Sequence, residues 1–464
     1  MAHQDELVFD PELIRRFDIN GPRYTSYPTA DRFSEEVDAR ALVNGLGKRV
    51  SCDGGHKPLS LYFHIPFCSA ICFYCACNKI ATKDHDLSSK YLDALDHEMR
   101  LQTAALAGPR QVTQLHLGGG TPTFLSDDEF RRLMALVRAH FELVPDGEYS
   151  IEVDPRKVNF GTVELLASLG FNRMSVGVQD FTEAVQIACN RVQSFDETRM
   201  VMEAARATGF RSVSMDLIYG LPKQSVDSFD RTLDNVLELS PDRVSLYSYA
   251  HLPSLFMPQR RIVEADLPTA DVKLQILQRA IRRLTGAGYC YIGMDHFAKP
   301  DDELTVAQRQ GRLHRNFQGY STQAECDMLA FGVSSIAKVG PLYAQNHKTL
   351  EAYYEALSRD ALPVLRGIEL SADDLIRRAA IQALMCHFSL SAESFGRAHS
   401  IDFNEYFKQE RLDLKEMESA GLVQVGEDGI DVLPPGRLLV RAIAMVFDRY
   451  LRADRERKRY SRVI

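Results

Sequence analysis

The sequence lacks the features that would place a chain at a membrane or on nucleic acid. No apolar run reaches the ~18–20 residues that a bilayer-spanning helix needs, and residues 1–6 lack the basic-then-apolar pattern of a signal peptide. A basic excess is also missing, since 55 Lys and Arg stand against 63 Asp and Glu and the formal net charge is −8. Generic nucleic-acid binding needs a basic surface. We therefore expect a cytoplasmic protein without a membrane or nucleic-acid partner.

Cysteine is sparse and unevenly distributed. Nine cysteines in 464 residues are too few for a disulfide framework. A scattered cytosolic cysteine is usually a small buried hydrophobe, and this is the prediction for Cys52, Cys189, Cys290, Cys326 and Cys386. The other four, Cys68, Cys72, Cys75 and Cys77, fall within ten residues.

The remaining composition is that of an ordinary globular protein, with 45% hydrophobic and 25% charged residues. The length suffices for one large domain and one or two small ones. Between about residues 59 and 300, helical patterns alternate with short apolar runs bounded by turn or polar residues, as in strands covered on both faces. The runs are Leu59–Ile65, Val112–Leu117, Tyr149–Val153, Met174–Val178, Val213–Tyr219 and Val244–Tyr249.

Six βα units in series predict an α/β fold with a parallel sheet, open or rolled into a barrel. One intervening helix is marked by Ser126 and Glu129, which form a capping-box pattern. In barrels, chemistry collects at the carboxyl ends of the strands. We expect an active site there because these ends are polar, glycine-rich or cysteine-bearing: His64–Cys77, Gly118–Thr121, Glu152–Asp154, Gln179-Asp180, Tyr219–Pro222 and Ala250-His251.

The two ends of the chain have different patterns. Before residue 59 the periodicity is weak, and Asn20–Pro28 contains two prolines, so we expect an ordered but irregular arm. After about residue 345 the pattern is mostly helical. A helix over 412–421 followed by a hairpin over 422–433 would resemble a small winged-helix unit, and the basic run 452–462 is typical of a solvated helix end.

The cysteine cluster has the spacing Cys68-x3-Cys72-x2-Cys75-x-Cys77. Thiolates hold iron–sulfur clusters, and closely spaced cysteines on one loop can wrap a cube. Structural zinc usually takes two ligand pairs separated by a longer stretch, and no second pair is evident at such spacing. An iron–sulfur cluster is therefore the favoured interpretation, with zinc or redox thiols as alternatives.

Two further features support a ligand site beside this loop. Gly118, Gly119 and Gly120 follow the second run, and a backbone without Cβ atoms can approach a ligand closely. Glu152 ends the third run and suits a sugar hydroxyl pair or a cation. A tight turn and a salt-bridged structural glutamate are the respective alternatives.

The CxxxCxxC spacing resembles the radical S-adenosylmethionine (SAM) signature. This resemblance implies that Cys68, Cys72 and Cys75 hold a [4Fe–4S] cluster whose open iron binds the amino and carboxylate groups of SAM. A fourth ligand would close the site, so Cys77 is expected beside the cluster without ligating iron.

Over nearly its whole length the chain resembles the oxygen-independent coproporphyrinogen III oxidase family. The motifs that carry the resemblance are Asn20–Thr29, Tyr62–Cys77, Gly118–Thr123, Glu152–Pro155, Ser175–Asp180, Asp216–Pro222, Gly293–Phe297 and Leu313–Tyr320. The family implies an incomplete (β/α)6 radical SAM barrel with an N-terminal arm and a mainly helical C-terminal domain. The expected division is an arm over 1–58, a barrel over 59–300, a connecting segment that completes the site over 301–350 and the C-terminal domain over 351–464.

The family also implies two SAM molecules in one site. By motif position, the cluster-bound SAM meets Tyr62, Gly119, Glu152 and Ile336. The second meets Tyr74, Gly120, Thr121, Gln179, Arg191, Asp216 and Ala250. Tyr74 stands where the family pattern has Phe. Cys77 and His64 are expected near the reacting groups.

The implied reaction is oxidative decarboxylation of two propionates of coproporphyrinogen III to vinyl groups, giving protoporphyrinogen IX in haem biosynthesis. Since the substrate carries carboxylates, the pocket should offer cations. The candidates are Arg23, Arg32, Lys299, Arg312 and Arg315, and Arg23 and Arg315 rank first because they lie inside family-like motifs. The expected partners are this substrate and an unidentified electron donor, and the expected state is a monomer.

Three other functions remain open at this point. A haem chaperone would share the radical SAM core, but such proteins tend to lack the Asn-Gly-Pro-Arg-Tyr arm and the fourth cysteine that this chain has. Another radical SAM enzyme, such as a methyltransferase, is the second. A non-catalytic scaffold with a structural cluster or zinc is the third, and it would leave Gly119, Gly120 and Glu152 unexplained.

Overall fold

The computed structural model describes residues 7–49, 56–323 and 326–453. Its contacts divide the chain into two units. The barrel unit comprises Arg32–Ala280 and Glu325–Glu369, and the C-terminal unit comprises the chain before residue 32, Ile281–Ala324 and the chain from Leu370 onward. The helices η1 (Ala30–Arg32) and α9 (Ala270–Gly286) cross the unit boundaries.

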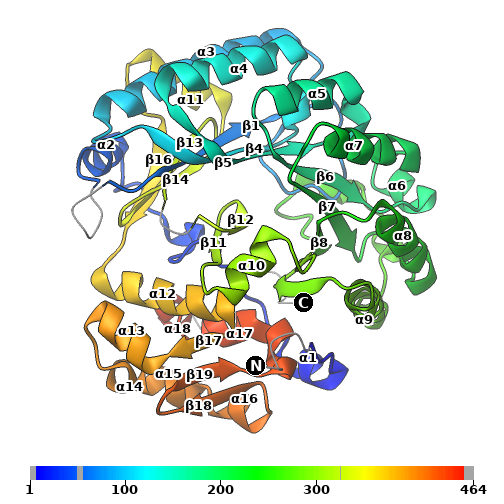
Figure 1. The fold of residues 1–464 in the computed structure, drawn as a ribbon, viewed down its shortest axis with the longest axis vertical. Coiled ribbons are helices and arrows are strands. Elements are labelled where there is room, and N and C mark those ends of the chain that lie inside the picture. The colour runs from blue at the N-terminus through cyan, green and yellow to red at the C-terminus, as the bar shows by residue number, and fades with distance from the viewer. Residues whose placement is uncertain (1–6, 50–55, 324–325, 454–464) are drawn as a thin grey trace. The chain divides into compact units, whose positions relative to one another are not determined.

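The barrel unit is built on one large sheet, whose strands follow the order β16-β15-β14-β13-β1-β4-β5-β6-β7-β8 (Figure 1). From β13 to β8 all neighbours pair in parallel, whereas β14, β15 and β16 pair antiparallel. The strands are β1 (Leu59–Ile65), β4 (Gln111–Gly119), β5 (Glu142–Val153), β6 (Arg173–Gln179), β7 (Ser212–Tyr219), β8 (Arg243–Ser248), β13 (Asp327–Phe331), β14 (Ile336–Val339), β15 (Leu342–Asn346) and β16 (Val364–Glu369).

All six predicted strands are present as β1 and β4–β8, in sequence order along the sheet. The predicted α/β class with an incomplete barrel is confirmed, since β8 neighbours neither β13 nor β16 in the described sheet. β5 begins seven residues before its predicted start. The strands β13–β16 were not predicted, and β13 extends the parallel part of the sheet beyond β1.

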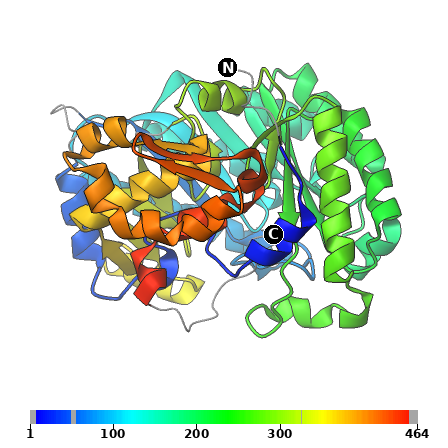
Figure 2. The same ribbon diagram turned by 90° about the horizontal axis from the view of Figure 1, so that it is seen from below.

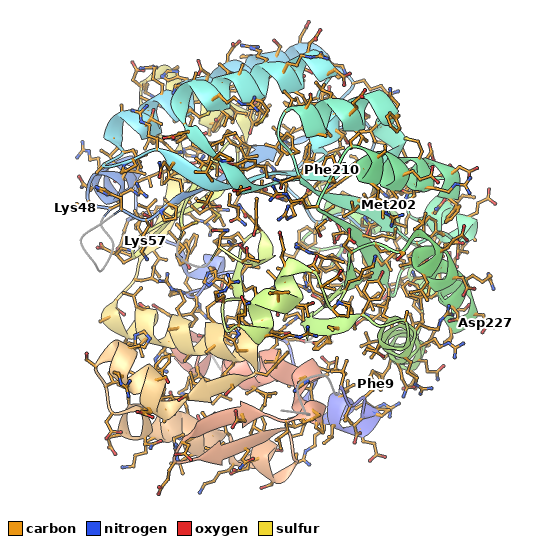
Figure 3. The ribbon with its side chains drawn as sticks, in the orientation of Figure 1. Phe9, Lys48, Lys57, Met202, Phe210 and Asp227 are labelled. Atoms are coloured by element: carbon orange, nitrogen blue, oxygen red, sulfur yellow. The ribbon has the colours of Figure 1, made fainter. Side chains whose placement is uncertain are left out.

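Helices cover the sheet as the βα pattern requires, and Figure 1 shows α3, α4, α5, α7 and α8 in one outer layer. The capping box predicted at Ser126 is formed and begins α4, which buries Phe130, Leu133 and Val137. Figure 3 labels the fully buried Met202 of α7 and the exposed Asp227 of α8. The helices of this unit are α2 (Ala39–Gly47), α3 (His85–Ala105), α4 (Asp127–His140), α5 (Phe160–Ser168), α6 (Glu183–Ala188), α7 (Phe195–Ala207), α8 (Val226–Leu239) and α11 (Leu350–Ser358), with the 3-10 turns η2 (Pro122–Phe124), η3 (Pro155–Lys157), η4 (Met257–Arg261) and η5 (Glu264–Asp266).

The C-terminal unit is mainly helical with small sheets. Its helices are α1 (Pro11–Phe17), α10 (Glu303–Arg309), α12 (Ala372–His387), α13 (Ala392–His399), α14 (Phe403–Tyr406), α15 (Lys408–Asp413), α16 (Lys415–Ser419), η6 (Pro434–Leu439), α17 (Val440–Met445) and α18 (Arg449–Ala453). Its strands are β9 (Cys290–Gly293), β10 (His296–Ala298), β11 (His314–Asn316), β12 (Gly319–Ser321), β17 (Ser389–Ser391), β18 (Val423–Gly426) and β19 (Gly429–Val432). The predicted hairpin is β18–β19, and β17 joins it, whereas the helix predicted over 412–421 is divided between α15 and α16.

The N-terminal arm is part of the core of the C-terminal unit. Tyr24 and Tyr27 are each 1% exposed and pack in the cluster that includes Leu384 and Phe447. The Tyr24 hydroxyl donates to Asp448 at 3.0 Å. As expected, Asn20–Pro28 forms no helix, but the flanking helices α1 and α2 were not predicted.

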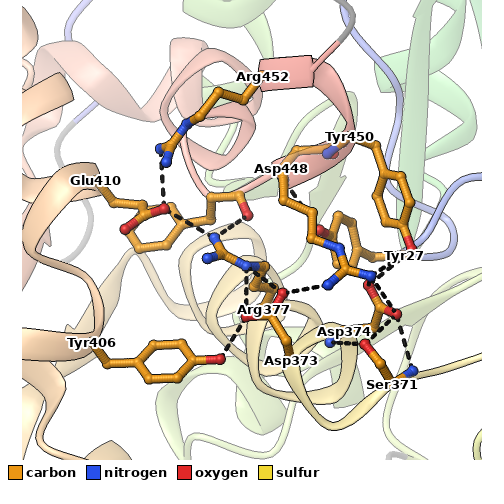
Figure 4. A network of polar contacts seen from close by, with 12 residues as sticks. Tyr27, Ser371, Asp373, Asp374, Arg377, Tyr406, Glu410, Asp448, Tyr450 and Arg452 are labelled. Carbon is orange, nitrogen blue, oxygen red and sulfur yellow. Dashed lines mark hydrogen bonds and ion pairs between the residues drawn. The ribbon is translucent and has the colours of Figure 1, made fainter.

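A polar network fastens α18 to α12 in the same unit (Figure 4). Arg377 pairs with Asp373 and with the buried Glu410, both at 2.9 Å. Arg449 reaches Asp373 at 2.8 Å and Arg452 reaches Glu410 at 3.0 Å. The buried Glu410 depends on these cations, because a buried charge without a partner is costly.

No helix in the described part of the chain is long and apolar enough to cross a membrane. Among the isolated cysteines, Cys189, Cys326 and Cys386 are buried as predicted, while Cys290 is partly exposed. Cys52 and most of the basic run 452–462 lie outside the described residues.

Candidate functional site

The loop that bears the four cysteines begins directly after β1. Two short strands, β2 (Phe67–Cys68) and β3 (Ile80–Ala81), pair in parallel and close its base. Their backbone contacts are Ile80 N to Pro66 O at 2.7 Å and Thr82 N to Cys68 O at 2.9 Å. The loop is therefore anchored at both ends, and residues 69–79 are left to surround a ligand.

Segments that follow β6 and β8 hold the far side of this cysteine loop. Asn190 Nδ2 donates to the Ile71 carbonyl at 2.8 Å, and Phe73 N donates to the Cys189 carbonyl at 2.9 Å. Gln259 Nε2 donates to the Tyr74 carbonyl at 3.1 Å. The carboxyl ends of the strands thus build one site, as the barrel argument expects.

The cysteine loop faces a cavity of about 170 Å³. The cavity wall brings together most of the predicted site residues: Cys68, Cys72, Tyr74, Cys75, Cys77, Gly119, Gly120, Thr121, Glu152, Gln179, Arg191 and Asp216. Tyr62, His64, Ala250 and Ile336 belong to the same unit but are not part of the wall.

The glycines leave room that a side chain would fill. A Cβ at Gly120 would lie 2.7 Å from the Pro66 carbonyl oxygen and 3.0 Å from Cys68 Sγ. Gly119 has φ +120°, and a Cβ there would lie 2.8 Å from the His64 ring. Both positions therefore require glycine, because the backbone passes directly beside the cysteine loop.

The thiols differ in their readiness to ionise. A hydrogen bond with Cys77 lowers the pKa of Cys75 to about 6, against the opposing effect of burial. Burial raises the pKa of Cys68 to about 11, although Thr121 Oγ1 lies 3.3 Å from its sulfur. A cation at the site would favour the thiolate in each case.

Arg191 is a buried cation beside the cysteine loop, and it is 8% exposed. It donates to the Gly177 carbonyl at 2.6 Å and approaches Cys72 Sγ at 3.7 Å. Asp154 lies 3.4 Å from Arg191 and 2.6 Å from Arg156. Burial acts to raise the pKa of Asp154, but the Arg156 hydrogen bond and the charge of Arg191 outweigh it and lower the pKa. Arg191 Nε is buried without a partner among the described residues, so it can still donate to a ligand.

Glu152 is oriented by its neighbours at the ends of β4 and β5. One carboxylate oxygen accepts from Gly119 N at 3.2 Å, and the other lies 3.5 Å from His116 Nε2. His116 Nδ1 lies 2.6 Å from Ser150 Oγ. The His116 ring stacks on Tyr62, with ring centroids 5.9 Å apart.

His64 is held as a neutral ring. Burial lowers its pKa. Its Nε2 donates to the Asn78 carbonyl at 2.9 Å, which leaves Nδ1 to accept from the Tyr62 hydroxyl at 3.1 Å. His64 therefore orients Tyr62, in the middle of β1.

Asp216 on β7 lines the same cavity as Glu152. Burial raises its pKa to about 6, although Ser175 and Ser245 donate hydrogen bonds to it, with Ser175 Oγ at 2.7 Å. At neutral pH it is a carboxylate that is costly to keep unpaired, so a hydroxyl or ammonium donor would bind it favourably.

The donor set and the space fit an iron–sulfur cube with a ligand beside it. Cys68, Cys72 and Cys75 open onto one cavity, and thiolates are the ligands of such clusters. Within the described residues, no three Cys, His, Asp or Glu side chains converge on a point where a single metal ion could bind. A cube presents its iron corners apart from one another, so its ligands do not need to converge.

Arg23 and Arg315 lie in the C-terminal unit. Arg23 pairs with Asp295, and Arg315 Nε donates to the Arg23 carbonyl at 3.4 Å. The Arg315 guanidinium lies 4.8 Å from the centroid of the Tyr320 ring. Arg441 is a third cation of this group, because its pKa is lowered to about 10 by burial and by the charges of Arg23 and Arg315.

Sequence reasoning missed several residues of the cavity wall, notably Lys79, Arg156 and Ser175. Lys79 Nζ donates to the carbonyls of Cys75 and Cys77 at 3.2 and 3.4 Å. His116 was missed as well, although a histidine between Leu115 and Leu117 in an apolar run is a detectable signal. Polar residues inside otherwise apolar strands would have indicated the residues in and around this cavity wall.

Comparison with known proteins agrees with this geometry. Residues 62–236 match the Radical SAM superfamily, and residues 370–439 match the HemN C-terminal domain. The oxygen-independent coproporphyrinogen III oxidase of Pseudomonas aeruginosa is 51% identical over 462 residues, which cover 99% of this chain and 100% of that protein. The enzyme of the same name from Escherichia coli K12 is 47% identical, covering 99% of each chain.

A solved structure is similar over the same extent. It carries the description "Coproporphyrinogen III oxidase (HemN) from Escherichia coli is a Radical SAM enzyme" and superimposes with a TM-score of 0.91 at 47% identity, covering 96% of this chain and 100% of that one. Sequence identity at this level and over this length, together with the cavity beside the cysteine loop, is decisive. The chain belongs to the oxygen-independent coproporphyrinogen III oxidase family of radical SAM enzymes.

Proposed function

We propose that this chain converts two propionate side chains of coproporphyrinogen III to vinyl groups and so gives protoporphyrinogen IX in anaerobic porphyrin biosynthesis. The observation that carries the proposal is the cavity that joins the cysteine loop to Gly119, Gly120, Arg191 and Asp216. The relationship to enzymes of this name over the full chain supports the choice of substrate.

Cys68, Cys72 and Cys75 would hold the [4Fe–4S] cluster, and Cys77 would remain free of iron. When bound, the cluster and SAM supply a 5′-deoxyadenosyl radical. This chemistry would remove a hydrogen atom from the carbon β to a carboxylate, and loss of CO2 and of one electron to an acceptor would then leave the vinyl group. The work of the chain's own residues is to position the reactants and to exclude other hydrogen donors.

Two SAM positions are part of the proposal. Tyr62, Gly119, Glu152 and Ile336 are assigned to the cluster-bound SAM. The second SAM is assigned to Tyr74, Gly120, Thr121, Gln179, Arg191, Asp216 and Ala250. The charges suit these assignments, since Arg191 would bind a carboxylate and Asp216 would accept from hydroxyls or an ammonium group.

His64 and Cys77 are proposed to act near the reacting groups. The hydrogen bond from the Tyr62 hydroxyl to His64 Nδ1 fixes the ring that faces Gly119. Arg23 and Arg315 are proposed to bind propionates, and Arg315 Nη1 supports this because it is a buried donor without a partner in the described part of the chain.

An anaerobic assay of the reconstituted protein tests the function. With SAM, a reductant and coproporphyrinogen III, we expect the divinyl product, and we expect none with Cys75→Ser. Retention of haem through purification without any divinyl product would instead favour the haem-chaperone function. A colourless protein with stoichiometric zinc after anaerobic purification would contradict both.

A further inference from the structure

Large apolar side chains are exposed on two segments that contact the cysteine loop. Ile187 and Val192 are 59% and 57% exposed, and Leu255, Met257 and Val263 are 66%, 71% and 60% exposed. Monomeric proteins rarely group such side chains without a binding role. Elsewhere in the described chain, the other large exposed apolar side chains, Ile19, Val43, Phe160 and Leu412, are dispersed along the sequence.

The exposed side chains lie in two segments, residues 187–192 and 255–263, and both segments hold the cysteine loop. Asn190, between Ile187 and Val192, bonds to the Ile71 carbonyl, and Gln259, between Met257 and Val263, bonds to the Tyr74 carbonyl. On their inner side, Val185, Cys189 and Ile262 form one buried cluster against which Phe73 and Tyr74 pack. The exposed side chains thus belong to the protein layer that lies directly behind the cysteine loop.

The segment between β8 and α9 extends as a green lobe beyond the strand ends in Figure 2. It carries Arg260 and Arg261, both exposed. The Arg261 guanidinium lies 5.4 Å from the centroid of the Phe73 ring, which places a cation beside the cysteine loop. The charges of Arg260 and Arg261 balance those of Glu264 and Asp266 within this lobe, but the two arginines form an adjacent pair of exposed cations, one of which lies beside Phe73.

The acidic residues nearest in sequence lie outside the stretches 187–192 and 255–263. Glu183 begins α6 and Glu264 begins η5. Asp266 lies 3.9 Å from Lys223, whose charge opposes it. The part of the lobe nearest to Phe73 is therefore apolar and cationic.

We propose that this surface, formed by Ile187, Val192, Leu255, Met257, Arg260 and Arg261, docks the protein that delivers electrons to the site. The inference rests on the proposed function, because cleavage of SAM needs one electron from outside the chain. The partner that fits is a small one-electron carrier with acidic side chains around an apolar tip. Its electron passes to the cluster across the Ile71–Cys75 part of the cysteine loop, which oxidises the carrier by one electron and reduces the cluster by one.

The chemistry of such a contact matches what the surface offers. Electron-transfer encounters use small interfaces, whose centre is apolar and whose charged rim sets the rate of association. Leu255 and Met257 supply the centre, and Arg260 and Arg261 supply the rim.

The test compares a protein reductant with a small one. The reconstituted holoenzyme is mixed anaerobically with reduced flavodoxin, or with a reduced plant-type ferredoxin, and loss of cluster absorbance is followed by stopped flow. A parallel series uses dithionite. The variants are the double changes Leu255→Glu with Met257→Glu and Arg260→Glu with Arg261→Glu. Phe160→Glu, at an exposed apolar position on α5, is the matched control.

We expect each double variant to lower the second-order rate with at least one carrier tenfold or more, while the dithionite rate, iron content and SAM cleavage with dithionite stay unchanged. The arginine variant should also lose the salt dependence of the rate. Equal carrier rates in wild type and variants would overturn the proposal, as would failure of both carriers to reduce the wild type. A dimer of the wild type that Leu255→Glu with Met257→Glu dissociates would also overturn it, because the surface would then be covered by a second copy. Failure of the proposed function appears separately, as absence of divinyl product with dithionite.

Discussion

Glu98 on α3 makes the stability of the barrel unit depend on pH. Its side chain is fully buried and accepts hydrogen bonds from Gly332 N at 2.8 Å, Tyr353 Oη at 2.6 Å and Asn346 Nδ2 at 2.7 Å. Burial raises its pKa from the ordinary 4.5 to about 7, because these hydrogen bonds only partly offset the loss of water. Glu98 thus ties the ends of β13 and β15 to α3.

The sign of the effect follows from proton linkage. Between pH 4.5 and about 7 the folded chain holds a proton on Glu98 that the unfolded chain has lost. The stabilisation is complete below pH 4.5 and is lost as the pH rises through about 7. The pKa difference of about 2.5 corresponds to about 3.5 kcal/mol in full, at about 1.4 kcal/mol for each pKa unit.

The perturbation that isolates this effect is Glu98→Gln. The amide cannot ionise, but its NH2 group would face two donors, which lowers the free energy of unfolding by about 1–3 kcal/mol. The excess stability of the wild type over Glu98→Gln should therefore shrink by about 3 kcal/mol between pH 4.5 and pH 8. Because the chain has no tryptophan, urea unfolding is followed by circular dichroism. Glu238→Gln, at an exposed position of α8, is the control. If the difference in the free energy of unfolding between the wild type and Glu98→Gln stays constant with pH, the raised pKa of Glu98 is refuted.

Four further outcomes are expected. Cys75→Ser should lose most of its iron after anaerobic reconstitution, whereas Cys77→Ser should keep its iron and the SAM-induced change in its electron paramagnetic resonance spectrum; the reverse result would contradict the ligand assignment. Gly120→Ala should bind less iron than Gly286→Ala, since the added Cβ would meet Pro66 and Cys68 in the first case and nothing within 4 Å in the second; equal iron contents would show that the loop can move aside. Arg377→Ala should destabilise the C-terminal unit by about 3–5 kcal/mol, because Glu410 then keeps a buried charge with one cation fewer (Figure 4). The control Arg397→Ala breaks an exposed pair with Glu393 and should cost no more than about 1 kcal/mol. Similar thermal denaturation curves for the two variants would refute this expectation. Removal of residues 1–30 should open the C-terminal unit to limited proteolysis while iron binding persists. The deletion removes both Tyr24 and Tyr27 from the core of that unit, and burial of one aromatic side chain is worth about 3–5 kcal/mol. A protease-resistant C-terminal unit would contradict this expectation.

The strands that sequence reasoning found are those whose pattern is local. Leu59–Ile65 is a mostly apolar run, and it folds as β1 with the predicted bounds. Asp327–Phe331 begins with a charged residue, which is buried in β13 beside Arg49 at 3.0 Å and accepts from Gly340 N at 2.9 Å. Leu342–Asn346 ends in two polar residues, and Asn346 is buried because it bonds to Glu98. Partners so distant in sequence leave no periodic signal, so β13 and β15 could not be predicted from their own residues.

The candidate site was predictable where residue type alone limits the chemistry. Closely spaced cysteines and consecutive glycines allow few interpretations, and they line the same cavity. Arg156 and Lys79 are ordinary charged residues in the sequence. Their place in the cavity wall depends on where β5 ends and on how the cysteine loop returns to β3, which are properties of the assembled sheet.

Arg23 shows how fold and charge placement depend on each other in the C-terminal unit. The sequence assigned Arg23 and Arg315 to one function by motif alone, and the structure brings both close to Asp295 and Arg441. Tyr24, the neighbour of Arg23, is a core residue, and the Gly21 carbonyl accepts from Arg441 at 2.6 Å. Burial of the tyrosine therefore fixes the backbone that carries the arginine. A cation held in this way would lose little conformational freedom on binding a carboxylate, so the residues that complete the core would also favour the propionate binding proposed for Arg23.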